Sequence, residues 1–124
     1  MIKQFQEHFN ERYQEPTAIQ SAVAAALAND QSVLGIAPTG SGKTLAFTLP
    51  LLPKVMPGTG TQLLVLSPSQ ELALQTARVM REWATLIGVK VQSLTGGANL
   101  RRQVMKLHEH PDVVVGTPGR VLHM

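Results

Sequence analysis

The segment Val33–Thr44, which reads VLGIAPTGSGKT, decides the fold class of this 124-residue chain. Its first part, Val33–Ala37, is an apolar run of the kind expected for a strand that is buried on both faces of a parallel sheet. A glycine-rich turn follows at once, and Lys43 and Thr44 then open a helical pattern. A buried strand, a glycine-rich turn and a helix in this order are the context of a phosphate-binding loop.

The loop has eight residues, which we predict to hold a nucleoside triphosphate: Ala37, Pro38, Thr39, Gly40, Ser41, Gly42, Lys43 and Thr44. Its two glycines let the backbone turn so that successive N–H groups face one point, where the helix N-terminus adds its positive end. Lys43 can place its ammonium between the β- and γ-phosphates, and Thr44 can offer its hydroxyl to Mg²⁺. The alternative, a turn with a capping threonine and a chance lysine, leaves Gly-Lys-Thr at the helix start unexplained.

Further strands and helices alternate along the chain. Apolar runs at Leu63–Leu66 and Val113–Val115 predict two more buried strands, and Val89, Val91 and Leu94 mark a shorter one. Besides the helix that starts at Lys43, apolar residues at helical spacing mark three more: the first spans the first dozen residues with Phe5 and Phe9 on one face, and the second follows Thr17 with Val23 on its face. The third is Glu71–Ile87, ended by Gly88, with an apolar face of Leu72, Leu74, Val79, Trp83 and Leu86. This alternation predicts an α/β fold, a mostly parallel sheet flanked by helices in one domain at residues 1–124.

Composition restricts the class of protein. Hydrophobic residues make up 44% and charged residues 15%, which is globular composition, and no apolar run reaches membrane-spanning length. We expect no membrane partner. Cysteine is absent, which fits a reducing, cytoplasmic location, and the net charge of +3 is compatible with a polyanionic partner. Arg101, Arg102 and Lys106 are expected on a solvated helix face, and His108 and His110 on the surface rather than at a metal site.

Five segments together resemble the motifs of DEAD-box RNA helicases. The loop Ala37–Thr44 has the form A-x-T-G-x-G-K-T, with alanine where the family has it. Pro16–Gln20 is similar to the family's Q motif and Pro68–Ala73 to its P-T-R-E-L-A segment, while Thr95–Gly97 and Thr117–Arg120 match its double-glycine and T-P-G-R motifs. The resemblance implies the first RecA-like domain of an enzyme that uses ATP and Mg²⁺ to remodel or unwind RNA, with Lys43 and Thr44 as catalytic residues.

The Q motif suggests how the base of the nucleotide is read. The amide of Gln20 can pair with the N6 donor and N7 acceptor of adenine together, a pattern that guanine does not present. The resemblance adds Tyr13 as the aromatic residue that stacks on the adenine ring. The alternative is that Gln20 faces solvent and Tyr13 is a packing residue.

The other three motifs imply sequence-independent contacts to the RNA backbone, from Pro68, Ser69, Gln70, Gly96, Gly97, Thr117, Pro118, Gly119 and Arg120. The glycine pair can bring main-chain N–H groups close to a phosphate, and Thr117 can cap a helix whose N–H groups face another phosphate. Gln70 departs from the family, which has an arginine there, so we expect weaker phosphate contact at that point. Taken singly, the glycine pair is equally compatible with an ordinary turn, and Thr117–Arg120 with the start of an ordinary capped helix.

The family's acidic motif, its S-A-T segment and its second RecA-like domain do not occur before Met124. We therefore expect the chain alone to bind ATP without hydrolysing it, and Val33–Ala37 to lack its neighbouring strands, so that the isolated chain is oligomeric or melts with poor cooperativity. Two alternatives stay open: a non-catalytic nucleotide-binding or interaction module of the same fold, and a DNA-acting relative. Protein partners cannot be inferred from the sequence.

Overall fold

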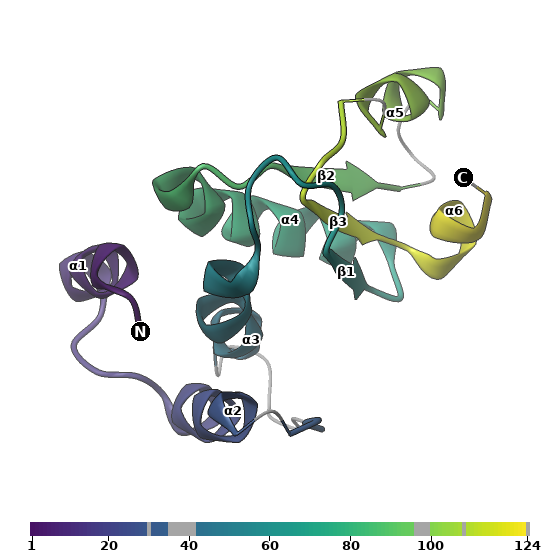
Figure 1. Cartoon of the computed structure of the whole chain (residues 1–124). Coiled ribbons are helices and arrows are strands. Elements are labelled where there is room, and N and C mark those ends of the chain that lie inside the picture. Colours follow the sequence, from purple (N-terminus) through teal and green to yellow (C-terminus); the bar gives the residue numbers. More distant parts are fainter. Residues whose placement is uncertain (30, 35–41, 96–99, 108, 124) are drawn as a thin grey trace. The chain divides into compact units, whose positions relative to one another are not determined.

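The computed structural model describes residues 1–29, 31–34, 42–95, 100–107 and 109–123 (Figure 1). The chain divides into two compact units, Met1–Lys54 and Val55–Met124. The first unit contains helices α1, α2 and α3, and the second contains a parallel sheet with helices α4, α5 and α6. The fold is therefore α/β, as predicted.

The helices of the first unit follow the predicted pattern. Helix α1 spans Lys3–Arg12 and buries Phe5 and Phe9. Helix α2 spans Ala18–Ala28, and Val23 is its buried apolar residue. Helix α3 spans Lys43–Leu51, continues into the 3₁₀ turn η1 at Leu52–Lys54, and packs against α2.

Thr17 caps α2, as predicted. Its hydroxyl accepts a hydrogen bond from the backbone N–H of Gln20, and the Gln20 side chain accepts one from the N–H of Thr17, so the two residues form a capping box. This reciprocal pair satisfies two N–H groups at the start of the helix that would otherwise lack a partner. The sequence signal was sufficient here because both partners are local.

The prediction of a buried strand is wrong for Val33 and Leu34. Residues 31–34 have no regular secondary structure, and Leu34 is 87% exposed. The remaining residues of the predicted strand, 35–37, lie outside the described residues. An apolar run becomes a strand only where a neighbouring strand pairs with its N–H and C=O groups, and no described residue of the first unit lies in a strand.

The second unit is built on a parallel sheet with the strand order β1-β3-β2. Strand β1 spans Leu63–Leu66, β2 spans Val91–Leu94 and β3 spans Val113–Gly116, each close to its predicted position. Every residue of the central strand β3 is buried. Leu64 and Leu66 of β1 are each 52% exposed, so the prediction of burial on both faces holds for β3 and is wrong for β1.

Helix α4 covers Gln70–Ala84 and passes into the 3₁₀ turn η2 at Thr85–Ile87. Gly88 ends it in the left-handed conformation with φ 71°, as predicted. The predicted apolar face is wrong except at Trp83: Leu72, Leu74 and Leu86 are exposed and Val79 is only half-buried. The buried face is instead Ala73, Ala77, Met80, Trp83 and Ala84, since small alanines let α4 lie close against β2 and β3.

The amino-terminal end of the sheet is held by one buried carboxylate. Asp112 is 1% exposed and accepts hydrogen bonds from the N–H of Gly58 at 2.9 Å and the N–H of Lys90 at 3.0 Å. The predicted loop Pro57–Thr61 is mostly exposed and is tied to β3 through this contact.

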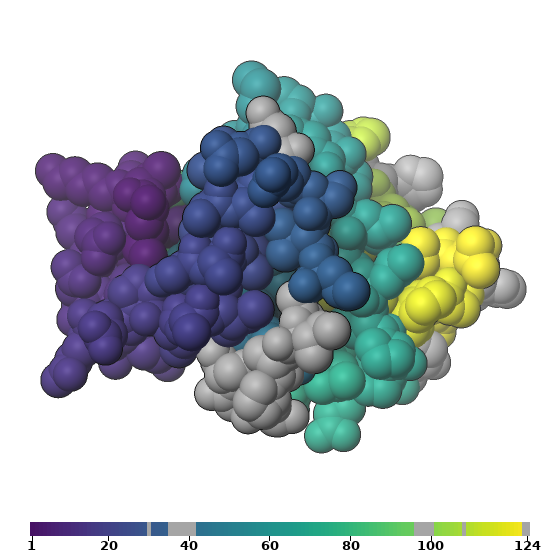
Figure 2. Space-filling view, turned by 90° about the horizontal axis from the view of Figure 1, so that it is seen from below, coloured from purple at the N-terminus to yellow at the C-terminus, as the bar shows by residue number. Residues whose placement is uncertain are grey.

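Two further helices complete the second unit. Helix α5 spans Leu100–Leu107, and helix α6, the yellow surface in Figure 2, spans Pro118–His123.

Candidate functional site

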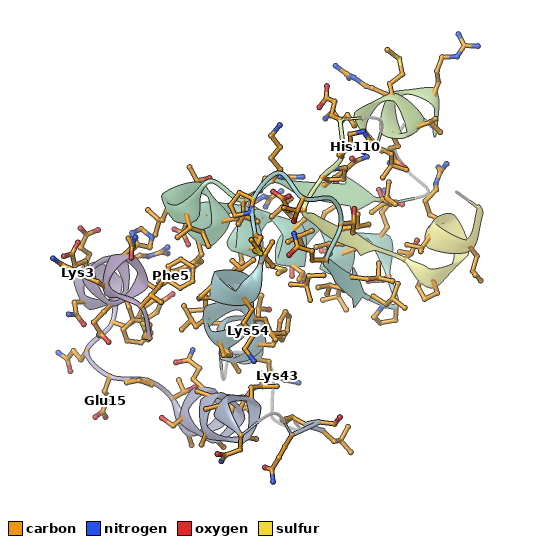
Figure 3. All side chains as sticks on the ribbon, in the orientation of Figure 1. Lys3, Phe5, Glu15, Lys43, Lys54 and His110 are labelled. Atoms are coloured by element: carbon orange, nitrogen blue, oxygen red, sulfur yellow. The ribbon has the colours of Figure 1, made fainter. Side chains whose placement is uncertain are left out.

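The helix predicted to follow the phosphate loop begins at Lys43. Gly42 precedes it with φ 87°, a conformation that a residue with a Cβ rarely adopts. Lys43, labelled in Figure 3, is exposed, and Thr44 is half-buried. The other predicted loop residues, Ala37 to Ser41, lie outside the described residues.

Gln20 lies directly against this helix start. It is 6% exposed, its Oε1 accepts a hydrogen bond from the N–H of Thr17 at 2.9 Å, and its Nε2 donates to the carbonyl of Gly42 at 3.4 Å. A Cβ on residue 42 would come within 2.4 Å of that nitrogen, so any larger residue here would displace the Gln20 amide from its contact with the Gly42 carbonyl. The alternative of a solvent-facing Gln20 is therefore wrong.

These contacts do not use the full hydrogen-bonding capacity of the Gln20 amide. An amide oxygen can accept two hydrogen bonds and an amide nitrogen can donate two, and the protein uses one at each atom in the bonds described above. The second lone pair and the second hydrogen have the polarity that the N6 and N7 atoms of adenine require.

Tyr13 combines packing with exposure. It ends α1, and its ring centroid lies 4.9 Å from that of Phe9. The ring is still 39% exposed, and the guanidinium carbon of Arg12 lies 5.8 Å from its centroid. Tyr13 is thus a packing residue that also presents aromatic surface, so a stacking role remains a prediction.

In the second unit, the strand register brings the segments of the predicted RNA motifs to one edge. Leu66, Gly116 and Leu94 are neighbours at the carboxyl ends of β1, β3 and β2. The N–H of Ser67 donates to the carbonyl of Gly116 at 2.9 Å, and the N–H of Thr117 donates to the carbonyl of Leu94 at 3.1 Å. We call this row of strand ends the carboxyl edge.

Two of the three motif segments can be followed beyond the carboxyl edge. Pro68, Ser69 and Gln70 are exposed, and the Ser69 hydroxyl caps α4 by accepting a hydrogen bond from the N–H of Leu72 at 3.2 Å. Thr117 directly precedes α6, whose first residue is Pro118; Gly119 is exposed, and Thr117 and Arg120 are half-buried. Gly96 and Gly97 lie outside the described residues.

Sequence reasoning missed Gln103, which holds the start of the third segment. Its side-chain nitrogen donates to the carbonyl of Thr95 at 3.0 Å, and its own carbonyl accepts from the side chain of Gln92 at 2.9 Å. Gln103 is 5% exposed, although it stands among exposed cations on α5. The sequence does contain one signal for this burial: Gln103 stands at helical spacing from Leu100 and Leu107, so it falls on the apolar face of the helix pattern.

The described part of the chain contains no group of three or more His, Cys, Asp or Glu side chains arranged to hold a metal ion. His110 is exposed, as expected, and His108 lies outside the described residues. Among the helices that the structure describes, none has the length and apolar character needed to span a membrane.

Known proteins with similar sequences are RNA helicases by name. The chain is 40% identical over 121 residues to the probable ATP-dependent RNA helicase YfmL of Bacillus subtilis, covering 96% of the chain and 32% of that protein. It is 39% identical over 128 residues to the ATP-dependent RNA helicase ddx46 of Dictyostelium discoideum, covering 98% of the chain and 11% of that protein. The chain thus spans a third or less of these relatives.

Solved structures agree with the sequence comparison. A hypothetical ATP-dependent RNA helicase from Sulfolobus tokodaii matches 99% of this chain with a TM-score of 0.87 at 31% identity, and the match covers 36% of that chain. A DEAD box protein from Methanococcus jannaschii matches equally well, with 34% of its chain covered. These neighbours confirm the RecA-like fold class. The family model of the DEAD/DEAH box helicases matches residues 17–124, so the chain belongs to the DEAD/DEAH box helicase family.

Proposed function

We propose that this chain is the ATP-binding and RNA-backbone-binding part of an ATP-dependent RNA helicase. ATP would bind at the start of α3, with its phosphates at Ala37–Thr44, its Mg²⁺ at Thr44 and its adenine at Gln20 and Tyr13. The observation that supports this most is the contact between Gln20 and Gly42, because it joins the predicted base-reading residue to the predicted phosphate loop. The residues present suit the cation, since Thr44 offers a hydroxyl beside the loop that would hold the phosphates.

The RNA backbone would lie across the carboxyl edge. The support is geometric, because Pro68–Gln70, the segment from Thr95 and Thr117–Arg120 all leave the sheet there. Backbone contacts carry no base information, so we propose binding without sequence preference. The absence of cysteine also fits a cytoplasmic location for the protein.

Within such an enzyme, we propose that these 124 residues bind and position the nucleotide but do not complete phosphoryl transfer. Transfer needs a residue that orients the attacking water and cations placed on the transferring phosphate. Lys43 can neutralise phosphate charge, yet the sequence up to Met124 has no acidic motif of the family's kind.

Nucleotide competition tests the proposal in the protein at its full encoded length. We expect Lys43→Ala to weaken ATP binding by about tenfold to a hundredfold, because one charged hydrogen-bonding partner of the phosphates is lost. Adenosine binding should hardly change. Lys3→Ala removes an exposed cation from α1 and is the matched control, with no effect expected.

A second arm of the experiment addresses the base. ATP should displace a fluorescent ATP analogue at lower concentration than GTP does, and Gln20→Ala should reduce that difference. Equal affinities for ATP and GTP in the unmodified protein would contradict the role of Gln20. Stimulation of hydrolysis by DNA but not by RNA would favour the DNA-acting alternative, and no hydrolysis with either would favour a non-catalytic module.

A further inference from the structure

A groove of about 760 Å³ lies beside β2 in the second unit. Its lining includes Arg81 of α4, Lys90 just before β2, and Arg102 and Lys106 of α5. None of its described lining residues belongs to the motif segments at the carboxyl edge. We call it the basic groove.

Two helices frame the outer edge of β2. The Gln92 side chain bonds to the carbonyl of Gln103 at 2.9 Å and so faces α5, which means that Val91 and Ser93 point to the opposite side of the sheet. Helix α4 packs against β2, and the Nε of Arg81 donates to the carbonyl of Val91 at 3.2 Å. The basic groove therefore has a strand edge at its base and a helix on each side.

Charge in the basic groove is strongly one-sided. The side chains of Arg81, Lys90, Arg102 and Lys106 are all exposed, and they come from three separate segments. Glu109 is the single carboxylate among the described lining residues. A concave surface with this excess of cations attracts an anionic ligand.

The remaining lining favours an acidic peptide over a nucleic acid. Surfaces that follow single-stranded nucleic acid usually combine cations with aromatic rings on which bases stack. The described lining of the basic groove contains no aromatic residue, and its aliphatic Val91 is half-buried. The exposed part of Val91 can contact an apolar residue of a peptide.

The edge of β2 also offers backbone groups for pairing. The carbonyls of Lys90 and Leu94 accept from the N–H groups of Val113 and Thr117 and so point toward β3. Residues 91 and 93 alternate with these and so direct their carbonyls away from β3; the carbonyl of Val91 accepts from Arg81, which leaves Ser93 as the residue that can pair with an added strand. An outer strand edge of this kind is a template for an added strand.

We propose that the basic groove binds an extended acidic segment of a partner protein, which lies along β2 and places carboxylates against Arg81, Lys90, Arg102 and Lys106. Backbone pairing at Ser93 fixes the direction of the peptide, and the surrounding cations select acidic residues.

The test uses a fluorescein-labelled peptide of ten residues in which Glu and Val alternate, with binding to the full-length protein measured by fluorescence anisotropy. Lys90→Ala combined with Lys106→Ala should raise Kd about twofold to thirtyfold, as expected for the loss of two exposed ion pairs. The matched control, Lys3→Ala combined with Arg78→Ala, removes two exposed cations outside the basic groove and should leave Kd unchanged.

Two further probes separate charge from strand addition. A peptide with Gln in place of Glu should bind more weakly, and so should an acidic peptide that is N-methylated at alternate residues, which keeps its charge but loses backbone donors. Equal binding of either probe overturns the proposal, and so does equal weakening by the control variant. Displacement of the peptide by single-stranded RNA that depends on Lys90 and Lys106 would make the basic groove an RNA surface and also overturn it.

Discussion

The two units bring their functional segments together in different ways. In the second unit, backbone hydrogen bonds between parallel strands align Leu66, Gly116 and Leu94, and the motif segments follow from these strand ends. In the first unit, α3 packs against α2, and the amide of Gln20 donates to the carbonyl of Gly42 at the start of α3. Among the described residues, a single polar side chain thus joins the Q motif to the end of the phosphate loop, whereas backbone bonds along a sheet align the motif segments of the second unit. Substitution of one side chain should therefore disturb the described contact between motifs more directly in the first unit than in the second.

The largest expected effect is the loss of packing under α4. Met80 lies on the buried face of α4 and is fully buried. Met80→Ala should therefore lower the free energy of unfolding by about 2–5 kcal/mol. Leu72 lies on the same helix but is 48% exposed, and Leu72→Ala should change it by less than about 0.5 kcal/mol. Denaturant unfolding followed by the fluorescence of Trp83 measures both. A loss for Leu72→Ala as large as that for Met80→Ala would contradict the exposed position of Leu72 on α4.

A smaller effect is expected at the cap of α2. Thr17→Ala removes the hydroxyl that accepts from the N–H of Gln20, and it should lower the free energy of unfolding by about 1 kcal/mol. Thr17→Ser keeps the acceptor and should retain most of the stability. Thermal unfolding of the two variants measures the difference. If serine and alanine destabilised equally, the methyl group rather than the capping hydrogen bond would be the stabilising feature.

The smallest expected effect concerns RNA binding at the carboxyl edge. Gln70 is exposed at the start of α4, so Gln70→Arg should add one phosphate contact and strengthen RNA binding. The slope of log affinity against log salt concentration should steepen by about 0.7 for a single strand. Gln75→Arg adds the same charge at an exposed position in the middle of α4 and serves as control. An unchanged slope for Gln70→Arg would show that residue 70 does not face RNA.

Much of the fold could be predicted because its signals are local. The capping box at Thr17 and Gln20 and the terminating Gly88 each depend on residues within a few positions of one another. The strands at Leu63–Leu66 and Val113–Gly116 were likewise found from short apolar runs. The order of the strands was not available from these runs, since it depends on pairing between segments that are far apart in the sequence.

The wrong predictions share one cause, which is that burial depends on neighbours and not only on apolarity. Leu34 and Leu64 stand in apolar runs but are exposed, because a strand is buried only on the sides that other elements cover. On α4 the apolar pattern predicts that the leucines are buried, whereas the small side chains of Ala73 and Ala77 allow the closer approach to the sheet. Gln103 was overlooked for a related reason, because its partner, the carbonyl of Thr95, is a backbone atom that carries no sequence signal.

The strand order β1-β3-β2 also determines when the strands can pair during translation. In the described sheet, β1 and β2 each pair only with β3, which is the last of the three to leave the ribosome. Translation proceeds at roughly 5–20 residues per second, so β1 stays without its partner strand for roughly 3–10 s after it is made. During this interval the backbone N–H and C=O groups of Leu63–Leu66 lack the partner strand that they have in the folded sheet.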